Sequence, residues 1–350
     1  MNNFYDALET RSAAEREAAL PQQVAHAQEK APAFASILTG VDAQAINSRA
    51  ALARLPVTRK HELLEKQQAA RKAAGNTFGG FSSISYGAAM PRVFASPGPI
   101  YEPEGTRRDY WRMARAMFAA GFRPGDLIHN SFSYHFVPAG SMMETGAHAL
   151  GCTVFAGGTG QTEQQVQAMA ELAPAGYIGT PSFLKIILER AFELQTPLPS
   201  VKRALVSGEA FPPSLRDWMA ERGVAGYQCY ATADLGLIAY ETEARQGLVL
   251  DEGVLLEIVR PGTGDPVPEG EVGEVVITSF NTDYPLIRFG TGDLSAVLPS
   301  ACPSGRSNTR IKGWMGRADQ TTKVRGDVEL LAPGSLPNDG VVIQDARSYR

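Results

Sequence analysis

The sequence predicts an α/β protein in which parallel sheets are covered by helices and a small β subdomain follows. Strand-like and helix-like segments alternate with short connections through residues 107–222, a pattern typical of a parallel sheet with helices on both faces. From residue 248 the sequence changes to segments rich in β-branched residues beside a Pro-Gly turn, which indicates a β-hairpin. With 350 residues, 44% hydrophobic and 20% charged, the chain is also long enough for two or three packed units.

The bulk charge and the cysteine pattern disfavour several classes of function. A net charge of -4 and a pI near 5.8 provide no basic field, so neither nucleic acid nor a membrane is an expected partner. Cys152, Cys229 and Cys302 are far apart and odd in number, which fits neither a disulfide framework nor a zinc site, and the histidines show no metal spacing. No segment resembles a signal peptide or a membrane span. We therefore expect a cytoplasmic protein with a small-molecule site.

The first part of the chain is expected to be mainly helical. Its Ala-, Glu- and Gln-rich start has apolar residues at helical spacing, and Pro32 then opens a turn-rich stretch that lasts to residue 47. Thr58 is a plausible cap for a later helix. The expected helices are 6–30, 50–55 and 58–64, followed by a loop over 75–91 and a strand over 92–95.

The middle of the chain supplies the alternating elements. In parallel sheets of this kind ligands lie beyond the carboxyl ends of the strands. Three segments occupy such positions, namely residues 157–160, 207–210 and 229–234. The expected helices are 107–120, 141–150, 163–172, 182–194 and 213–222, and the expected strands are 126–132, 153–156, 177–179, 203–206, 254–259 and 273–278.

Residues 96–103 are expected to form a loop after the first strand. Nucleotide-binding proteins place phosphate-cradling backbone amides at this position. Here Pro97 and Pro99 remove backbone donors, and Glu102 adds negative charge where phosphates would lie. We therefore interpret the loop as structural rather than phosphate-binding.

Two late segments organise the candidate site. Residues 284–293 end in Asp293, whose carboxylate can accept hydrogen bonds from two vicinal hydroxyls, as a ribose offers. Residues 316–326 place a charged turn between Gly316 and Gly326, which suits a hinge. Each segment alone also fits an ordinary surface turn. Their order and close spacing favour a nucleotide site followed by a hinge.

Across residues 50–326 the ordered motifs resemble the adenylate-forming acyl-CoA synthetase superfamily, and most closely the phenylacetate-CoA ligase family. The resemblance implies the fold of that superfamily's large N-terminal domain. It also implies an enzyme that joins a carboxylate to ATP with Mg²⁺, forming an acyl-adenylate and pyrophosphate, and then passes the acyl group to coenzyme A with release of AMP. The implied substrate is an aryl or related carboxylate. A lid domain rotates between the two half-reactions in that family.

The segment Tyr230-Ala231-Thr232-Ala233-Asp234 is similar to the family's aromatic-Gly-x-Thr/Ser-Glu motif. The resemblance implies that Tyr230 stacks near adenine, that Thr232 meets the α-phosphate and that Asp234 helps to hold Mg²⁺. Asp234 is one methylene shorter than the family's Glu, so ligation through a water is open as well as direct ligation. A helix cap is the alternative role for Thr232 and Asp234.

Further site residues follow from the same resemblance. The strand-end segment at 207–210 is similar to the adenine-contacting segment of the family, and Asp293 matches its ribose-binding aspartate. Arg288 is expected to neutralise a phosphate or to hold Asp293, with a structural ion pair as the alternative. Asp319 matches the hinge residue, and Arg317 is its neighbour. The implied catalytic residues are Thr232, Asp234 and Arg317, and the implied nucleotide-binding residues are Ser207, Gly208, Glu209, Ala210, Tyr230, Arg288 and Asp293.

The acyl pocket is expected at Tyr134, His135 and Phe136, because the segment from Ser133 resembles the one that lines this pocket in the family. An aromatic ring there packs against an aryl substrate. His135 is interpreted as a core or gate residue rather than a base, since the carboxylate substrate arrives already ionised.

The chain departs from the family at two places. The family's phosphate loop reads Ala-Ser-Ser-Gly-Thr-Thr-Gly-Lys-Pro, whereas residues 95–103 carry Pro99 and Ile100 in place of the two threonines and Glu102 in place of the lysine. Family members also carry a lid of roughly 100 residues after the hinge. This sequence ends at residue 350, with Val341 where the catalytic lysine normally stands. We therefore expect a lid that is mostly missing.

These departures leave more than one hypothesis open. The first is a phenylacetate-CoA ligase-like enzyme with impaired adenylation. The alternatives are a nucleotide- or acyl-binding homologue without activity, a homodimer or subunit whose partner chain supplies a lid, and an acyl transferase that starts from a preformed adenylate or thioester. The expected division is an N-terminal helical segment (1–78), an AMP-binding core with the β subdomain from about 248 (79–316), and the hinge with a lid remnant (317–350).

Overall fold

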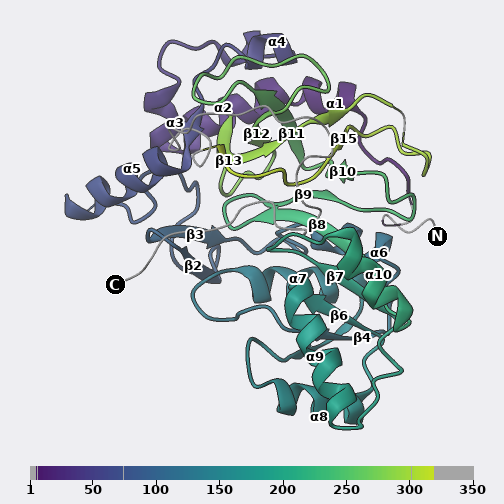
Figure 1. The fold of residues 1–350 in the computed structure, drawn as a ribbon. Helices are drawn as coiled ribbons and strands as arrows, with labels where there is room; N and C mark the ends of the chain where they lie inside the picture. The colour runs from purple at the N-terminus through teal and green to yellow at the C-terminus, as the bar shows by residue number, and fades with distance from the viewer. Residues whose placement is uncertain (1–4, 6, 74, 301, 319–350) are drawn as a thin grey trace, which may run out of the picture.

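The computed structural model describes residues 5, 7–73, 75–300 and 302–318. Its largest sheet has nine strands in the order β14-β15-β10-β9-β8-β7-β6-β4-β5 (Figure 1). Five of them run parallel: β5 (Thr153–Ala156), β4 (Leu127–Asn130), β6 (Gly176–Gly179), β7 (Arg203–Val206) and β8 (Ala225–Thr232). The other four continue the sheet in antiparallel pairing: β9 (Gly236–Tyr240), β10 (Leu248–Leu250), β15 (Arg310–Ile311) and β14 (Val297–Leu298). The predicted parallel sheet is confirmed, and the antiparallel extension adds to it.

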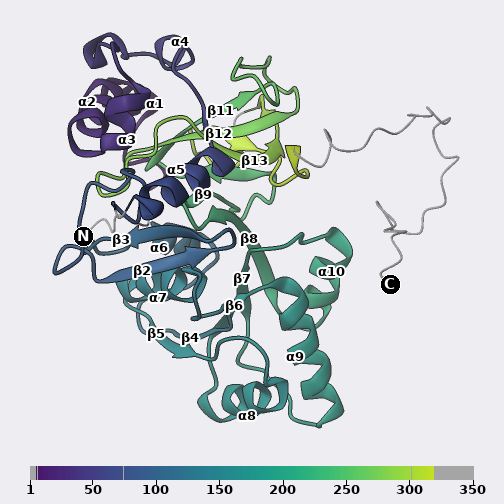
Figure 2. The ribbon, with the colours of Figure 1, turned by 90° about the vertical axis from the view of Figure 1, so that its left-hand side faces the viewer.

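Helices cover both faces of the parallel strands, as predicted. Alternate residues of a strand point to opposite faces. Leu205 of β7 packs in a cluster with residues of α6 and α7, whereas its neighbours Ala204 and Val206 pack in a second cluster with residues of α8, α9 and α10. These helices are α6 (Met113–Ala119), α7 (Ala139–Leu150), α8 (Thr162–Leu172), α9 (Pro181–Glu193) and α10 (Pro213–Glu221) (Figure 2).

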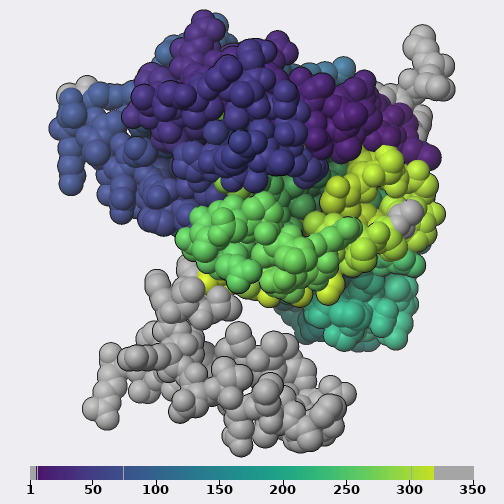
Figure 3. Space-filling view, turned by 90° about the horizontal axis from the view of Figure 1, so that it is seen from above, coloured from purple at the N-terminus to yellow at the C-terminus, as the bar shows by residue number. Residues whose placement is uncertain are grey.

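A second sheet of four strands carries the β subdomain. Its order is β1 (Thr58–Arg59), β13 (Phe289–Ser295), β12 (Gly273–Ser279) and β11 (Val254–Val259). The predicted hairpin is confirmed, because β11 pairs antiparallel with β12 along its whole length. The N-terminal helices pack on this sheet through one shared hydrophobic cluster, and the purple and blue surface lies against the green and yellow surface in Figure 3. The helices of this cluster are α2 (Leu20–Lys30), α3 (Pro32–Ile37), the 3-10 helix η1 (Ala43–Ala45) and α4 (Arg49–Leu52), and α1 (Ala13–Ala18) precedes them.

Several predicted boundaries were wrong, for identifiable reasons. Thr58 is not a helix cap: it lies in β1, paired with β13, and α5 (Lys60–Lys72) begins after Arg59. The expected loop after Pro32 contains α3, because a proline is well suited to the first turn of a helix. The helix expected from residue 107 begins only at α6, because Arg112 before it has a left-handed φ of 65°.

The predicted loop over residues 96–103 is instead largely a hairpin. β2 (Arg92–Ser96) pairs antiparallel with β3 (Ile100–Glu104), and only residues 97–99 connect them. The two prolines of the connection led to the expectation of a loop. They lie in the turn itself, where a missing backbone N–H costs nothing. The hairpin forms its own two-stranded sheet beside α5.

None of the helices in the ranges given above is long and apolar enough to cross a membrane. The expectations about the lid, the hinge residue Asp319 and Val341 fall on residues 319–350, outside the part of the chain that the structure describes.

Candidate functional site

Asp293 lies at the centre of the candidate site. It belongs to β13, and its carboxylate is buried among donors from two other segments. The Tyr230 hydroxyl donates to Oδ2 at 2.7 Å, while Trp314 Nε1 and Arg317 Nη1 each donate to Oδ1 at 3.1 Å. Burial, and next the Asp293 carboxylate, raise the pKa of Tyr230 well above its ordinary value, so the hydroxyl remains a donor. These three hydrogen bonds therefore fix the orientation of the Asp293 carboxylate.

Two cavities meet at this aspartate. The first, which we call the β7 cavity, has a volume of about 670 Å³ and is lined by residues 207–210 after β7 together with Tyr230, Trp314 and Asp293. The second, the α5 cavity, has a volume of about 620 Å³ and is lined by the start of α5 together with Thr232, Asp234, Asp293 and Arg317. Both volumes lie in the range typical of small-molecule sites.

Apart from Arg288, the predicted nucleotide-binding and catalytic residues each line one of these two cavities, and Asp293 lines both. Ser207, Gly208, Glu209 and Ala210 lie with Tyr230 on one side of Asp293. Thr232, Asp234 and Arg317 lie on the other side. Residues from strand ends far apart in the sequence are thus brought to one place, as expected for the carboxyl edge of a parallel sheet.

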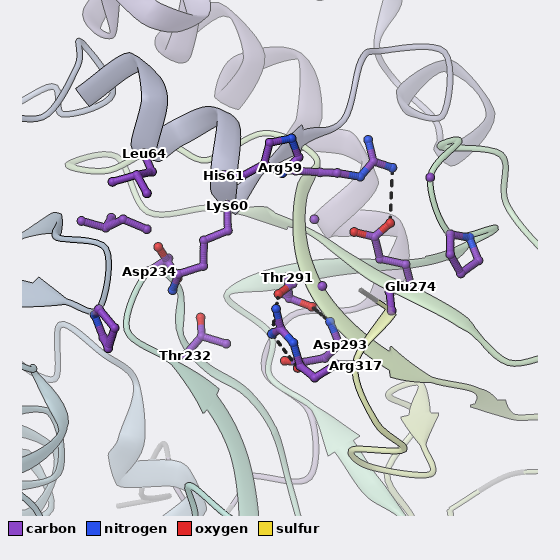
Figure 4. Close-up of a pocket in the computed structure, with 17 residues that line it drawn as sticks. Arg59, Lys60, His61, Leu64, Thr232, Asp234, Glu274, Thr291, Asp293 and Arg317 are labelled. Atoms are coloured by element: carbon purple, nitrogen blue, oxygen red, sulfur yellow. Dashed lines mark hydrogen bonds and ion pairs between the residues drawn. The ribbon is translucent and has the colours of Figure 1, made fainter. Parts of the chain in front are cut away.

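Asp234 forms an ion pair that the sequence did not predict. Its Oδ2 is 2.8 Å from Lys60 Nζ, which extends from the first residue of α5 toward Asp234 and Thr232 (Figure 4). The Asp234 side chain is only 1% exposed, and its Oδ1 has no hydrogen-bond partner among the residues that the structure describes. Burial lowers the pKa of Lys60, but the Asp234 carboxylate outweighs it and raises the pKa above its ordinary value. The lysine is therefore a charged ammonium at this cavity.

Thr232 ends β8, and its hydroxyl accepts a hydrogen bond from the Leu235 N–H at 3.2 Å. The alternative role as a helix cap does not apply, because the segment turns into β9 rather than into a helix. The hydroxyl hydrogen is left to donate toward a group in the α5 cavity, which Thr232 lines.

Glu102 does not line the α5 cavity, contrary to the expectation that it places a negative charge there. It is fully buried on β3, where it accepts hydrogen bonds from the Ser96 N–H at 3.2 Å and from the Ser96 hydroxyl. Burial, and next the Asp234 carboxylate, raise the pKa of Glu102 to about 8. Its carboxyl group is thus mostly uncharged at neutral pH.

This shift predicts a dependence of stability on pH. The folded state holds the Glu102 proton more tightly than the unfolded chain does, so its stabilisation is complete below pH 4.5 and is lost as pH rises toward about 8. Glu102→Gln cannot titrate, so we expect its unfolding free energy relative to the wild type to rise by about 4 kcal/mol between pH 5 and pH 9. Urea denaturation at both pH values measures the difference. The same shift in the exposed control Glu65→Gln, or none in Glu102→Gln, would contradict the assignment.

Arg288 was predicted as a nucleotide-binding residue, and the structure corrects this. Its guanidinium forms a two-pronged ion pair with Glu257, at 2.9 and 3.0 Å, and donates to the carbonyl groups of Ala53, Leu55 and Gly264. The side chain is 1% exposed and reaches neither cavity. The structural ion pair, which was the alternative, is therefore correct, because the core of the second sheet needs a partner for buried Glu257.

The residues expected to line an acyl pocket lie in the loop between β4 and α7. The Tyr134 hydroxyl accepts a hydrogen bond from Asn130 at 2.8 Å and donates to Glu144 at 2.9 Å, whereas His135 and Phe136 are exposed. The loop is tied to β2 by a hydrogen bond from the Ala95 N–H to the Phe136 carbonyl. None of the three lines the β7 cavity or the α5 cavity, so their role stays a prediction.

Comparison with known proteins bears directly on this site. Residues 106–282 match the family of AMP-binding enzymes. The chain is 30% identical to the phenylacetate-coenzyme A ligase of Thermus thermophilus over 94% of its own length and 77% of that protein. It is also 30% identical to the phenylacetate-coenzyme A ligase of Aromatoleum evansii, over 88% of its own length and 70% of that protein.

Among solved structures, the chain is similar to the open conformation of 2-hydroxyisobutyryl-CoA ligase in complex with 2-HIB-AMP and CoA. The TM-score is 0.78 at 28% sequence identity, over 89% of this chain and 71% of that one. The α/β fold expected from the sequence motifs is therefore confirmed.

Proposed function

Because the chain belongs to the family of AMP-binding enzymes, we propose that it is an AMP-forming acyl-CoA ligase of the phenylacetate-CoA ligase type. Such an enzyme joins the carboxylate of its substrate to the α-phosphate of ATP and releases pyrophosphate. The sulfur of coenzyme A then attacks the acyl carbon, and AMP leaves. The main structural support for the proposal is that two cavities, each large enough for a small molecule, meet at the buried carboxylate of Asp293.

This arrangement suits a nucleotide that lies across both cavities. The adenine would occupy the β7 cavity against residues 207–210 and Tyr230. A ribose hydroxyl would donate to Asp293, because an ionised carboxylate has about four lone-pair sites and Tyr230, Trp314 and Arg317 use three of them. The phosphates would then lie in the α5 cavity, where Thr232 and Arg317 offer a hydroxyl and a guanidinium.

Asp234 fits the role of a Mg²⁺ ligand. Its buried Oδ1 has no hydrogen-bond partner among the described residues and is an oxygen of the kind that Mg²⁺ prefers. The described ranges contain no group of three or more His, Cys, Asp or Glu residues placed to hold a metal. A Mg²⁺ ion here would therefore take most of its ligands from phosphate oxygens and water, as is usual for nucleotide sites. When bound, the ion neutralises phosphate charge and polarises the phosphoryl group.

The acid substrate is proposed to be an aryl or other small carboxylate. The curated relatives are phenylacetate-coenzyme A ligases, and the structural relative is a 2-hydroxyisobutyryl-CoA ligase. The aromatic side chains of the loop after β4, Tyr134 and Phe136, remain the proposed contacts of the acyl group. We further propose that residues 79–316 act as the AMP-binding core.

Pyrophosphate release and CoA thioester formation test the proposal directly. The purified chain should be assayed with ATP, Mg²⁺, coenzyme A and a panel of acids that includes phenylacetate and 2-hydroxyisobutyrate. Release of pyrophosphate that depends on one of these acids supports the ligase. AMP binding without pyrophosphate release for any acid would instead favour the alternative of a nucleotide-binding homologue.

Thr232→Ala is expected to lower the rate of pyrophosphate release about tenfold. The variant loses one hydrogen bond to a charged phosphate, a loss worth about 1.5 kcal/mol. The fold should be intact, since the Thr232 hydroxyl makes only a turn contact, to Leu235, within the part of the chain that the structure describes. Thr263→Ala, which removes an exposed turn hydroxyl, is the matched control. An unchanged rate in Thr232→Ala would exclude a phosphate contact by this hydroxyl.

A further inference from the structure

The turn between β2 and β3 has few donors left with which to hold phosphates. Both the N–H and the hydroxyl of Ser96 donate to Glu102, and the Tyr101 N–H donates to Gln67 at 2.9 Å. Pro97 and Pro99 have no N–H at all. The turn nevertheless borders the α5 cavity through Pro97 and Ile100. Phosphates in this cavity therefore need donors from another segment.

The first turn of α5 supplies basic side chains to the same cavity. Three consecutive residues, Arg59, Lys60 and His61, line it. Their position is set by the pairing of β1 with β13 and by Glu62, which accepts a hydrogen bond from the Arg59 N–H at 2.8 Å. Helix α5 has 13 residues, and the amides of its first turn add a partial positive charge.

Lys60 is the best placed of the three. Arg59 is drawn to Glu274 at 3.3 Å, on the opposite side of the cavity from Asp234 in Figure 4. Lys60 instead reaches the buried carboxylate of Asp234 and lies beside Thr232. An ammonium has three donors, and Asp234 accepts from one of them. The side chain is 33% exposed, so its remaining donors can face a ligand in the cavity.

We propose that Lys60 is the residue that binds the β- and γ-phosphates of ATP, in place of the turn between β2 and β3. The inference rests on the proposed function, because it assumes that ATP lies across the two cavities. Asp234 holds the ammonium at the cavity through one oxygen, and its other oxygen stays available. The contact is electrostatic and specific to the outer phosphates, so AMP does not make it.

Calorimetric titration with ATP and with AMP, both in the presence of Mg²⁺, tests the proposal. Lys60→Met should weaken ATP binding at least tenfold and change AMP binding less than threefold. Lys60→Arg keeps the charge and should retain ATP binding within about fivefold. Lys66→Met is the matched control, since Lys66 is an exposed lysine of the same helix, and it should bind both nucleotides as the wild type does.

Each other outcome overturns the proposal. If Lys60→Met binds ATP as the wild type does, the outer phosphates are held elsewhere although the proposed function stands. If Lys60→Met and Lys60→Arg lose ATP and AMP equally, Lys60 only supports the fold through Asp234. If the wild type binds neither nucleotide, the proposed function fails together with the inference.

Discussion

Asp293→Ala is expected to lower the affinity for AMP about 10- to 100-fold. A ribose hydroxyl donates one hydrogen bond to this carboxylate in the proposed orientation, and a hydrogen bond to a charged group is worth about 1.5 to 3 kcal/mol. Its loss therefore costs about 1.5 to 3 kcal/mol, and about 1.4 kcal/mol corresponds to a factor of ten in affinity. Calorimetric titration with AMP measures the change.

The interpretation of Asp293→Ala depends on an intact site. The substitution also releases Tyr230, Trp314 and Arg317 from their shared acceptor, so the unfolding free energy should be measured beside the affinity. Asp293→Asn keeps the shape and one acceptor oxygen, and we expect an intermediate affinity for AMP. Asp217→Ala removes an exposed aspartate of α10 and serves as the control. AMP affinity that is unaltered in a folded Asp293→Ala variant would rule out the ribose contact.

Asp234→Asn is expected to lower the rate of adenylation about 1000-fold. The substitution keeps the size of the side chain but removes the charge that would attract Mg²⁺ and that holds Lys60 at 2.8 Å. A loss of about 4 kcal/mol in the transition state corresponds to this factor. Pyrophosphate release measured across a Mg²⁺ titration should show both a lower maximum and a need for more Mg²⁺.

Two controls test whether the lower rate and the greater need for Mg²⁺ are specific to the loss of the Asp234 charge. Asp265→Asn changes an exposed aspartate in the loop after β11 and should leave the rate and the Mg²⁺ dependence unchanged. AMP binding in the absence of Mg²⁺ should change little in Asp234→Asn, because Asp293 and the β7 cavity are intact. A normal Mg²⁺ dependence in Asp234→Asn would show that the metal is held elsewhere.

The elements that the sequence predicted well are those with strong local signals. The alternation of helices and strands from β4 to α10 was placed to within a few residues, because each segment carries its own periodic pattern and ends in Gly, Pro or a polar run. β1 was missed because its two residues become a strand only by pairing with β13, more than 200 positions later. β3 was missed because Pro97 and Pro99, which lie in the turn before it, led to the expectation of a loop.

The candidate site likewise combines residues that local motifs predicted with contacts between distant residues that they did not predict. The resemblance to the family's motifs selected Asp293, Thr232 and Asp234, and the structure brings all three to the α5 cavity. The resemblance gave no sign that Lys60 pairs with Asp234, although the run of three basic residues at a helix start was visible in the sequence. It also placed Arg288 wrongly, because a charged residue beside the site motif can equally be turned into the core.

The sequence by itself determined the family, the α/β class and the residues at the strand ends, since these depend on periodicity and on short motifs that persist in any context. Only the tertiary structure decided which charged side chains form ion pairs. It buried Arg288 with Glu257, turned Glu102 inward with a raised pKa, and brought Lys60 to Asp234 across 174 positions of sequence. The physical reason is that ion pairing and burial depend on distance in space, which the local pattern does not contain.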